Sequence, residues 1–158
     1  TGTWNVAQDQ DCTSVQGCGM AFRKSVLEEI GGFDVRLLWY RDDTDIGMRV
    51  AKRGRIRYVA AMSLEHLVHP SGGVRDYGCV YDNPVFYECD MTLFRKHWPL
   101  RLLPRFLWHH SRSHFLQRDL LTDPVKRKRL WAAVRGYLNS WLHTKRKITA
   151  EPYQALRS

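Results

Sequence analysis

Three aspartates within four consecutive positions are the residues of this sequence best suited to acid–base chemistry. They are Asp42, Asp43 and Asp45. A carboxylate in a substrate site can act as a general base and remove a proton from a reacting hydroxyl. The same three residues also fit the first turn of a helix, where aspartate caps free amide protons and faces the positive end of the helix dipole. The acids alone leave both roles open.

The histidines and cysteines show no spacing typical of a zinc site. The four cysteines are Cys12, Cys18, Cys79 and Cys89. Cys12 and Cys18 could join His66 and His69 in a metal site, but the two pairs are poorly spaced for a compact one. We therefore expect free, buried thiols in a reducing compartment.

The elements that would position the acids lie in the first half of the chain, residues 1–80. A capping box at Ser25 predicts a helix that ends at Gly31, and the acids predict a second helix that Gly54 ends. Residues 55–59 alternate between polar and apolar side chains, which indicates a strand, and residues 63–68 form a second expected strand.

The sequence pattern of residues 81–158 differs from that of the first half and predicts mainly helical structure. Apolar residues recur at helical spacing after Pro84, and Pro124 is expected in the first turn of the last helix. That helix has a broad apolar face and basic residues on both sides of it. The face comprises Leu130, Trp131, Val134, Tyr137, Leu138, Trp141 and Leu142.

Three segments in a fixed order resemble the C-terminal half of the catalytic domain of family 2 glycosyltransferases. Residues 17–24 (GCGMAFRK) are similar to a glycine-led segment before a helix in that family. The turn at 31–34 (GGFD) and the acidic run at 42–49 (DDTDIGMR) follow, and then residues 54–59 and a strand that carries His66. The resemblance spans roughly residues 15–73. It departs from the family at Val35, where an acid is usual, and at Asp42, where the family often has glutamate.

The resemblance implies a partial GT-A domain of the Rossmann-like α/β class at 1–80, followed by a basic helical extension at 81–158. It implies inverting transfer of a sugar from a nucleotide-diphosphate sugar to the hydroxyl of a glycan, glycolipid or lipid-linked acceptor. Asp43 matches the general base, with Asp42 beside it. The residues implied to contact the acceptor or substrate are Gly19, Met20, Trp39, Tyr40 and Asp45. For Trp39 and Tyr40, a role in the core is an equal alternative.

The resemblance also implies a divalent cation, Mg²⁺ or Mn²⁺, with His66 as a ligand and His69 as its competitor. A DxD motif completes such a site. Asp9-Gln10-Asp11 has this pattern but does not follow an apolar run, so we expect a loop there and place the true motif, with the donor-binding half, upstream of Thr1. A chain of this kind would be inactive alone. Arg23 and Arg49 could contact phosphate or pair with the acids, and we expect the pairing.

The net charge of +9, from 25 Lys and Arg against 16 Asp and Glu, predicts an anionic partner. A nucleic-acid-binding module without catalysis is the alternative function, but no zinc finger, RNA-recognition motif or helix-turn-helix pattern is present, and nucleic acid is not the expected partner. The helix after Pro124 either packs on the catalytic domain or lies on an anionic membrane surface. We expect a cytoplasmic protein of cell-envelope polysaccharide synthesis, peripheral on the inner face of the membrane.

Overall fold

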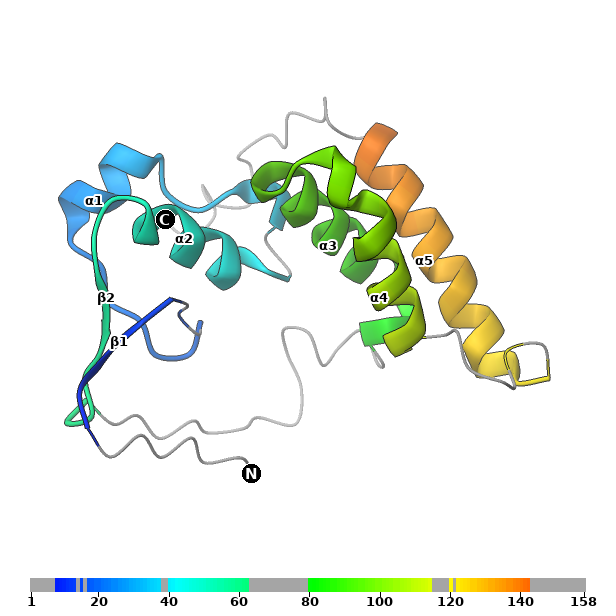
Figure 1. Cartoon of the computed structure of the whole chain (residues 1–158), viewed down its shortest axis with the longest axis horizontal. Coiled ribbons are helices and arrows are strands. Elements are labelled where there is room, and N and C mark those ends of the chain that lie inside the picture. Colours follow the sequence, from blue (N-terminus) through cyan, green and yellow to red (C-terminus); the bar gives the residue numbers. More distant parts are fainter. Residues whose placement is uncertain are drawn as a thin grey trace, which may run out of the picture. The chain divides into compact units, whose positions relative to one another are not determined.

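The computed structural model describes residues 8–13, 15, 17–37, 40–62, 80–114, 120 and 122–142 (Figure 1). The chain divides into two compact units, Thr1–Asp76 and Tyr77–Ser158. Most described residues lie in helices. Parts of the sequence analysis fall outside the described residues, namely Trp39, His66, His69, Cys79 and the strand expected at 63–68.

The described part of unit 1 contains two short α-helices and a two-stranded sheet. Its elements are β1 (Gln10–Cys12), α1 (Lys24–Ile30), a 3₁₀ turn (Val35–Leu37), α2 (Asp42–Ala51) and β2 (Ile56–Tyr58). The acids therefore begin a helix, as the sequence predicts, and residues 56–58 form the predicted strand.

Two glycines end α1. Gly31 has a φ of 78°, and its N–H donates to the Glu28 carbonyl, while the Gly32 N–H donates to the Leu27 carbonyl at 2.8 Å. This left-handed ending favours glycine because a Cβ is strained there. The predicted capping box at Ser25 is wrong: α1 is preceded by Arg23, and no side chain caps its first amides. Ser25 already lies inside the first turn, so its hydroxyl is not at the capping position.

The expected Rossmann-like α/β fold is wrong for the described residues. That fold needs parallel strands joined by helical crossovers, whereas the described sheet contains only β1 and β2, paired antiparallel with Asp11 opposite Arg57. The alternation of polar and apolar residues at 55–59 explains the difference. It suits an antiparallel strand with one face in solvent, while parallel strands are buried on both faces and read as continuous apolar runs.

The loop expected at Asp9-Gln10-Asp11 is wrong for Asp11, which lies in β1, while Asp9 directly precedes that strand. Asp9 accepts a hydrogen bond from the Ala60 N–H at 3.0 Å, and its other oxygen lies 3.4 Å from the Arg57 guanidinium. Asp11 lies 3.9 Å from Arg55. Both carboxylates thus face basic residues near β2.

The core of unit 1 forms around Ile46 and Val50 of α2 and Ile56 of β2. Half-buried residues from the preceding segments pack against it: Cys12, Val15, Met20, Phe22, Val26, Leu27 and Ile30. Burial of these side chains stabilises the unit through the hydrophobic effect. It also holds the segment at 17–24 against α2, although the two are separate in the sequence.

Among its described residues, unit 2 has three α-helices, α3 (Pro84–His97), α4 (Leu103–His114) and α5 (Pro124–Leu142), with 3₁₀ turns at Val80–Asp82 and Leu100–Leu102. α3 and α5 start alike. Asn83 and Asp123 each accept a hydrogen bond from the backbone N–H two residues on, and a proline occupies the first helical position. The predicted place of Pro124 is confirmed.

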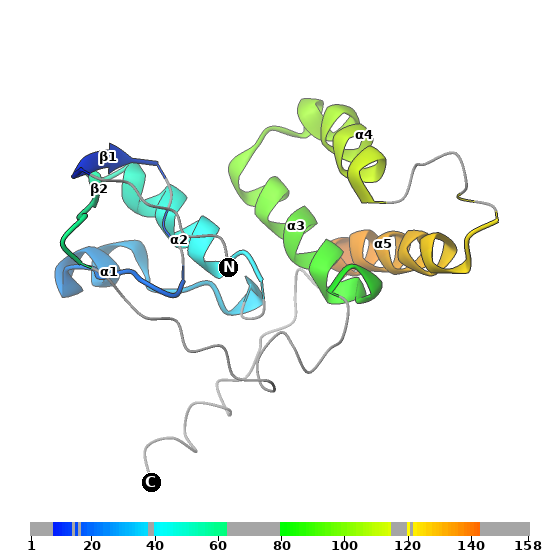
Figure 2. The ribbon, with the colours of Figure 1, turned by 90° about the horizontal axis from the view of Figure 1, so that it is seen from below.

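α3 and α5 lie side by side (Figures 1 and 2). The contact uses the small residues of α5, which are buried: Ala132, Ala133, Gly136 and Ser140. On α3 the buried side chains are large, among them Phe86, Tyr87 and Phe94. Small residues on one helix let the large ones of the other fill the interface, so α5 turns its small-residue face inward and leaves Trp131, Leu138 and Leu142 exposed. Among the described residues, no helix is both long and apolar enough to cross a bilayer.

Candidate functional site

The acids occupy the first turn of α2, directly after a backbone turn of unusual geometry. Arg41 has a φ of 70°, a conformation that non-glycine residues rarely adopt. Its carbonyl accepts the first helical hydrogen bond, from the Asp45 N–H at 2.9 Å. Its guanidinium lies 4.8 Å from the centroid of the Tyr40 ring, within cation–π range. Tyr40 therefore lies at the entrance to α2, next to the acids.

Asp43 connects this turn to the glycine-led segment. Its Oδ2 accepts a hydrogen bond from the Gly17 N–H at 3.1 Å, and its Oδ1 accepts from the Thr44 N–H at 2.6 Å and the Thr44 hydroxyl at 3.2 Å. A carboxylate has about four acceptor positions, so these three donors leave one open. Asp43 is half-buried. The side chain is thus fixed in place and still able to accept a proton.

Asp42 is also half-buried, and it makes no hydrogen bond or ion pair with any residue that the structure describes. Its carboxylate lies one residue from Asp43 on the same turn. Two neighbouring acids therefore differ in their surroundings: Asp43 is held by three donors and Asp42 by none among the described residues.

Asp45 is placed differently from the other two acids. Its side chain is 0% exposed, and it forms an ion pair with Arg49, one turn further along α2, at 2.8 Å. Arg49 also donates to the Ile30 carbonyl at the end of α1, at 2.8 Å. The expected pairing of Arg49 with an acid is confirmed, while Arg23 makes no ion pair with the described residues. The Asp45–Arg49 pair therefore ties α2 to α1.

We expect Asp45→Asn to lower the free energy of unfolding by about 2 kcal/mol, because the Arg49 guanidinium, 16% exposed, then loses a charged hydrogen-bond partner. Urea unfolding followed by far-ultraviolet circular dichroism measures the change. Glu28→Gln is the matched control: it breaks another pair four residues apart, with Lys24, but both side chains there are exposed. That change should stay within about 0.5 kcal/mol. Equal losses in the two variants would contradict the structural role of Asp45.

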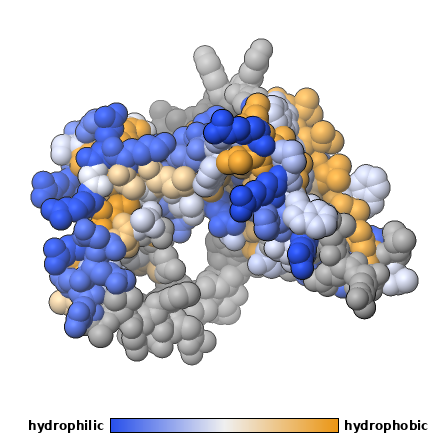
Figure 3. Space-filling view, viewed as in Figure 1, coloured by the Kyte–Doolittle hydropathy of each residue, from blue (hydrophilic) through white to orange (hydrophobic). Residues whose placement is uncertain are grey.

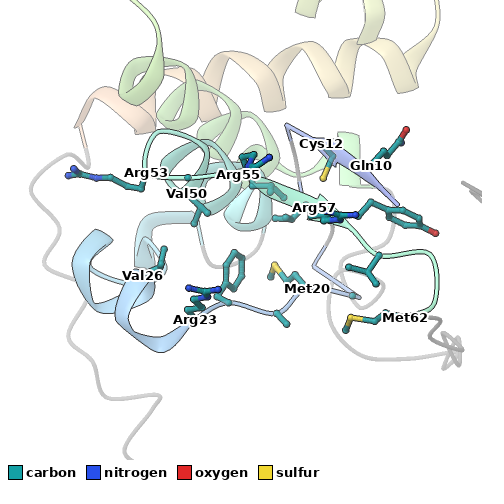
Figure 4. A pocket seen from close by; sticks show the side chains of 18 of the residues that line it. Gln10, Cys12, Met20, Arg23, Val26, Val50, Arg53, Arg55, Arg57 and Met62 are labelled. Atoms are coloured by element: carbon teal, nitrogen blue, oxygen red, sulfur yellow. The ribbon is translucent and has the colours of Figure 1, made fainter. Parts of the chain in front are cut away.

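A pocket of about 810 Å³ opens on unit 1 beside the glycine-led segment (Figure 4). Gly19 and Met20 line it, two of the residues expected to contact substrate. Its apolar wall is made by the buried Val50 and by half-buried residues that pack on the core, including Phe22 and Val26. The three acids of α2 do not line this pocket. The pocket reaches α2 at Val50, which lies seven residues after Asp43 and so about 10 Å further along the helix axis. The segment from Gly17 to Met20 connects the acids to the pocket, because the Gly17 N–H donates a hydrogen bond to Asp43 and Gly19 lines the pocket.

Basic side chains surround this pocket, a feature that sequence reasoning missed. The arginines that line it are Arg23, Arg53, Arg55 and Arg57. Arg53, Arg55 and Arg57 each lie within 4 Å of an acid. The shortest of these distances is 3.3 Å, between Arg53 and Glu29. All four arginines are exposed, and exposed pairs of this kind bind weakly. The pocket therefore combines an apolar wall with an edge that attracts anions.

The described residues offer no assembled metal site. No three His, Cys, Asp or Glu side chains among them lie close enough together to hold an ion. Cys12, Cys18 and Cys89 are free thiols. Cys89 is buried and Cys12 is half-buried against the core, but Cys18 is exposed, so the expected burial is wrong for Cys18.

Unit 2 contains a polar chain that the sequence analysis also missed. His110 of α4 lies between two partners, with Nε2 at 2.6 Å from Asp90 and Nδ1 at 2.6 Å from the Tyr137 hydroxyl. Burial, and next the charge of Asp90, raises the pKa of Tyr137. A neutral His110 satisfies both contacts, since Nε2–H donates to Asp90 and Nδ1 accepts from Tyr137. The hydrogen bonds between Asp90 and His110 and between His110 and Tyr137 link α3, α4 and α5. Because both ring nitrogens of His110 are occupied, the imidazole presents no free nitrogen to a substrate.

Comparisons of the chain with protein-family models, with curated proteins and with solved structures return no match.

Proposed function

We propose that unit 1 carries the acceptor-activating site of an inverting glycosyltransferase that uses a nucleotide-diphosphate sugar. The hydrogen bond between the Gly17 N–H and the Asp43 carboxylate is the observation that carries this proposal. It joins two of the segments that resemble family 2 glycosyltransferases, 26 residues apart in the sequence. A catalytic carboxylate needs such fixing, because a base misplaced by about 1 Å loses much of its effect.

In the proposed reaction, Asp43 removes the proton of the acceptor hydroxyl. The hydroxyl oxygen then bonds to the anomeric carbon of the donor sugar, while the bond from that carbon to the diphosphate oxygen breaks. The nucleoside diphosphate leaves with the bonding electrons, and Asp43 later releases the proton to water. The configuration at the anomeric carbon inverts, because attack and departure take place on opposite faces of the sugar.

The surroundings of Asp43 suit a polar acceptor. Asp42 and Tyr40 lie beside it, and Gly19 and Met20 border the pocket next to the glycine-led segment. The arginines of the pocket favour a substrate that bears phosphate, which is compatible with a lipid-linked acceptor or with the diphosphate of a donor. A glycan, a glycolipid or a lipid-linked precursor is therefore the proposed acceptor class.

We expect Mg²⁺ or Mn²⁺ to be required for transfer. A divalent cation would supply positive charge for the departing diphosphate. Removing it with EDTA should abolish transfer, and added Mn²⁺ or Mg²⁺ should restore it, as measured by release of nucleoside diphosphate. Full activity in excess EDTA would contradict the requirement without touching the role of Asp43.

The direct test is a donor and acceptor screen on the protein that carries this chain. Uridine, guanosine and thymidine diphosphate sugars are each supplied with glycan and polyprenyl-phosphate acceptors, and nuclear magnetic resonance determines the anomeric configuration of any product. Inversion supports the proposal. A product that retains the donor configuration, or no transfer from any of these donors, contradicts it.

A further inference from the structure

α5 presents an apolar face that the interior of unit 2 does not use. Trp131 is 72% exposed, Leu138 58% and Leu142 74%. These residues are seven and four positions apart, so they lie on one side of the helix. Val134 and Trp141 border them and are also exposed. In Figure 3, which has the view of Figure 1, apolar side chains gather along the side formed by α5.

The opposite side of α5 already meets its packing needs. Ala132, Ala133, Gly136 and Ser140 are buried there, and the position of a Cβ on Gly136 would lie 2.8 Å from the Tyr87 Cβ of α3. α5 is therefore already packed tightly against α3 through its small residues, and its exposed apolar residues are not needed for that contact. A row of large apolar side chains in water is unfavourable and marks a surface for interaction.

Basic residues lie on the same face. Arg127 and Arg135 are each four positions from Trp131, on the same side of the helix, and both are exposed. Lys128 lies at the edge of the face and 3.2 Å from Asp82. Arg135 makes no ion pair with the described residues, and α5 contains five Lys or Arg and no acid. The partner must therefore offer both negative charge and an apolar layer.

Other partners fit less well. In a pair of chains joined through this face, Arg127 and Arg135 of the two copies would approach one another with no acid on α5 to offset them. A nucleic acid would supply phosphates, but Trp131, Leu138 and Leu142 would face a charged backbone instead of an apolar layer. A bilayer surface with acidic lipids provides both features, since helices of this composition lie at the boundary between headgroups and acyl chains.

We propose that α5 docks on an anionic membrane surface. Trp131, Leu138 and Leu142 enter the boundary between headgroups and acyl chains, while Arg127 and Arg135 contact lipid phosphates. The surface belongs to unit 2, so this inference does not depend on the proposed sugar transfer.

Vesicle flotation tests the proposal with the whole chain. The chain is mixed with vesicles of phosphatidylcholine alone or of phosphatidylcholine with phosphatidylglycerol, at low and high salt. We expect binding to the anionic vesicles, lowered by salt. The double variant Trp131→Ser and Leu138→Ser should reduce partitioning about tenfold or more, because two large apolar side chains no longer enter the bilayer. Arg135→Gln should weaken binding to anionic vesicles only.

Trp108→Ser is the matched control, because Trp108 is 58% exposed but lies on α4. It should bind vesicles as the unaltered chain does, and circular dichroism checks that every variant folds. Four results would overturn the proposal: equal binding to neutral and anionic vesicles, no binding at low salt, unchanged binding by the double variant, or an equal loss in Trp108→Ser. If the chain does not bind vesicles but forms a dimer, and the double variant abolishes the dimer, the partner of this face is a second copy of the chain. If the chain instead binds RNA in a salt-dependent way that the double variant abolishes, the partner is a nucleic acid.

Discussion

Asp43→Asn should lower the rate of sugar transfer by about 10²- to 10⁴-fold, the usual contribution of a general base. Asparagine has nearly the same shape, and its amide oxygen can still accept a hydrogen bond from the Thr44 N–H. It cannot take up the proton of the acceptor hydroxyl. The loss should therefore appear in kcat, measured as nucleoside diphosphate release at saturating donor and acceptor, with little change in KM.

The control for Asp43→Asn is Asp11→Asn. Asp11 is an exposed carboxylate of the same unit, and its nearest basic partner lies 3.9 Å away. Asp11→Asn removes the same charge from unit 1 without altering the contacts of Asp43. The rate of sugar transfer should therefore remain near that of the unaltered protein. If Asp43→Asn folds normally and keeps near-normal kcat, Asp43 is not the base.

Gly136→Val should destabilise unit 2 by more than about 3 kcal/mol, the upper end of the usual cost of overpacking. A Cβ at this position would lie 2.8 Å from the Tyr87 Cβ and 2.9 Å from the Glu88 nitrogen, and still closer to the Pro84 carbonyl oxygen. Two of these atoms belong to the α3 backbone and cannot rotate away. α3 and α5 must therefore separate, which exposes the core between them. Urea unfolding followed by circular dichroism measures the loss.

Arg135→Val separates this clash from the lower helix propensity of valine. It places the same residue at the neighbouring position of α5, where the side chain is exposed. Its effect should stay within about 1 kcal/mol, since only propensity changes. If the two variants lose similar stability, the close contact of α3 and α5 at Gly136 is not as described.

The segments that resemble family 2 glycosyltransferases show which features a sequence pattern can predict and which it cannot. The acidic run predicts the start of α2 because the attraction between acids and the positive end of the helix dipole acts within the first turn. The pattern does not reveal that Asp43 bonds Gly17 while Asp45 is buried against Arg49. Neighbouring acids with the same local preference receive different surroundings only when distant segments pack around them. For the same reason, the four arginines of the pocket could not be grouped beforehand.

Features that depend on neighbouring residues follow from the amino-acid sequence alone. Gly31 and Gly32 end α1, Pro124 begins α5, and residues 56–58 are extended. Which of these elements contact one another depends on packing between distant parts of the chain. The antiparallel pairing of β1 with β2 replaced the expected parallel sheet, and the small face of α5, not its large apolar face, turned toward α3. Caps and turns are local interactions, whereas strand pairing and helix packing depend on how partners far apart in the chain fit one another.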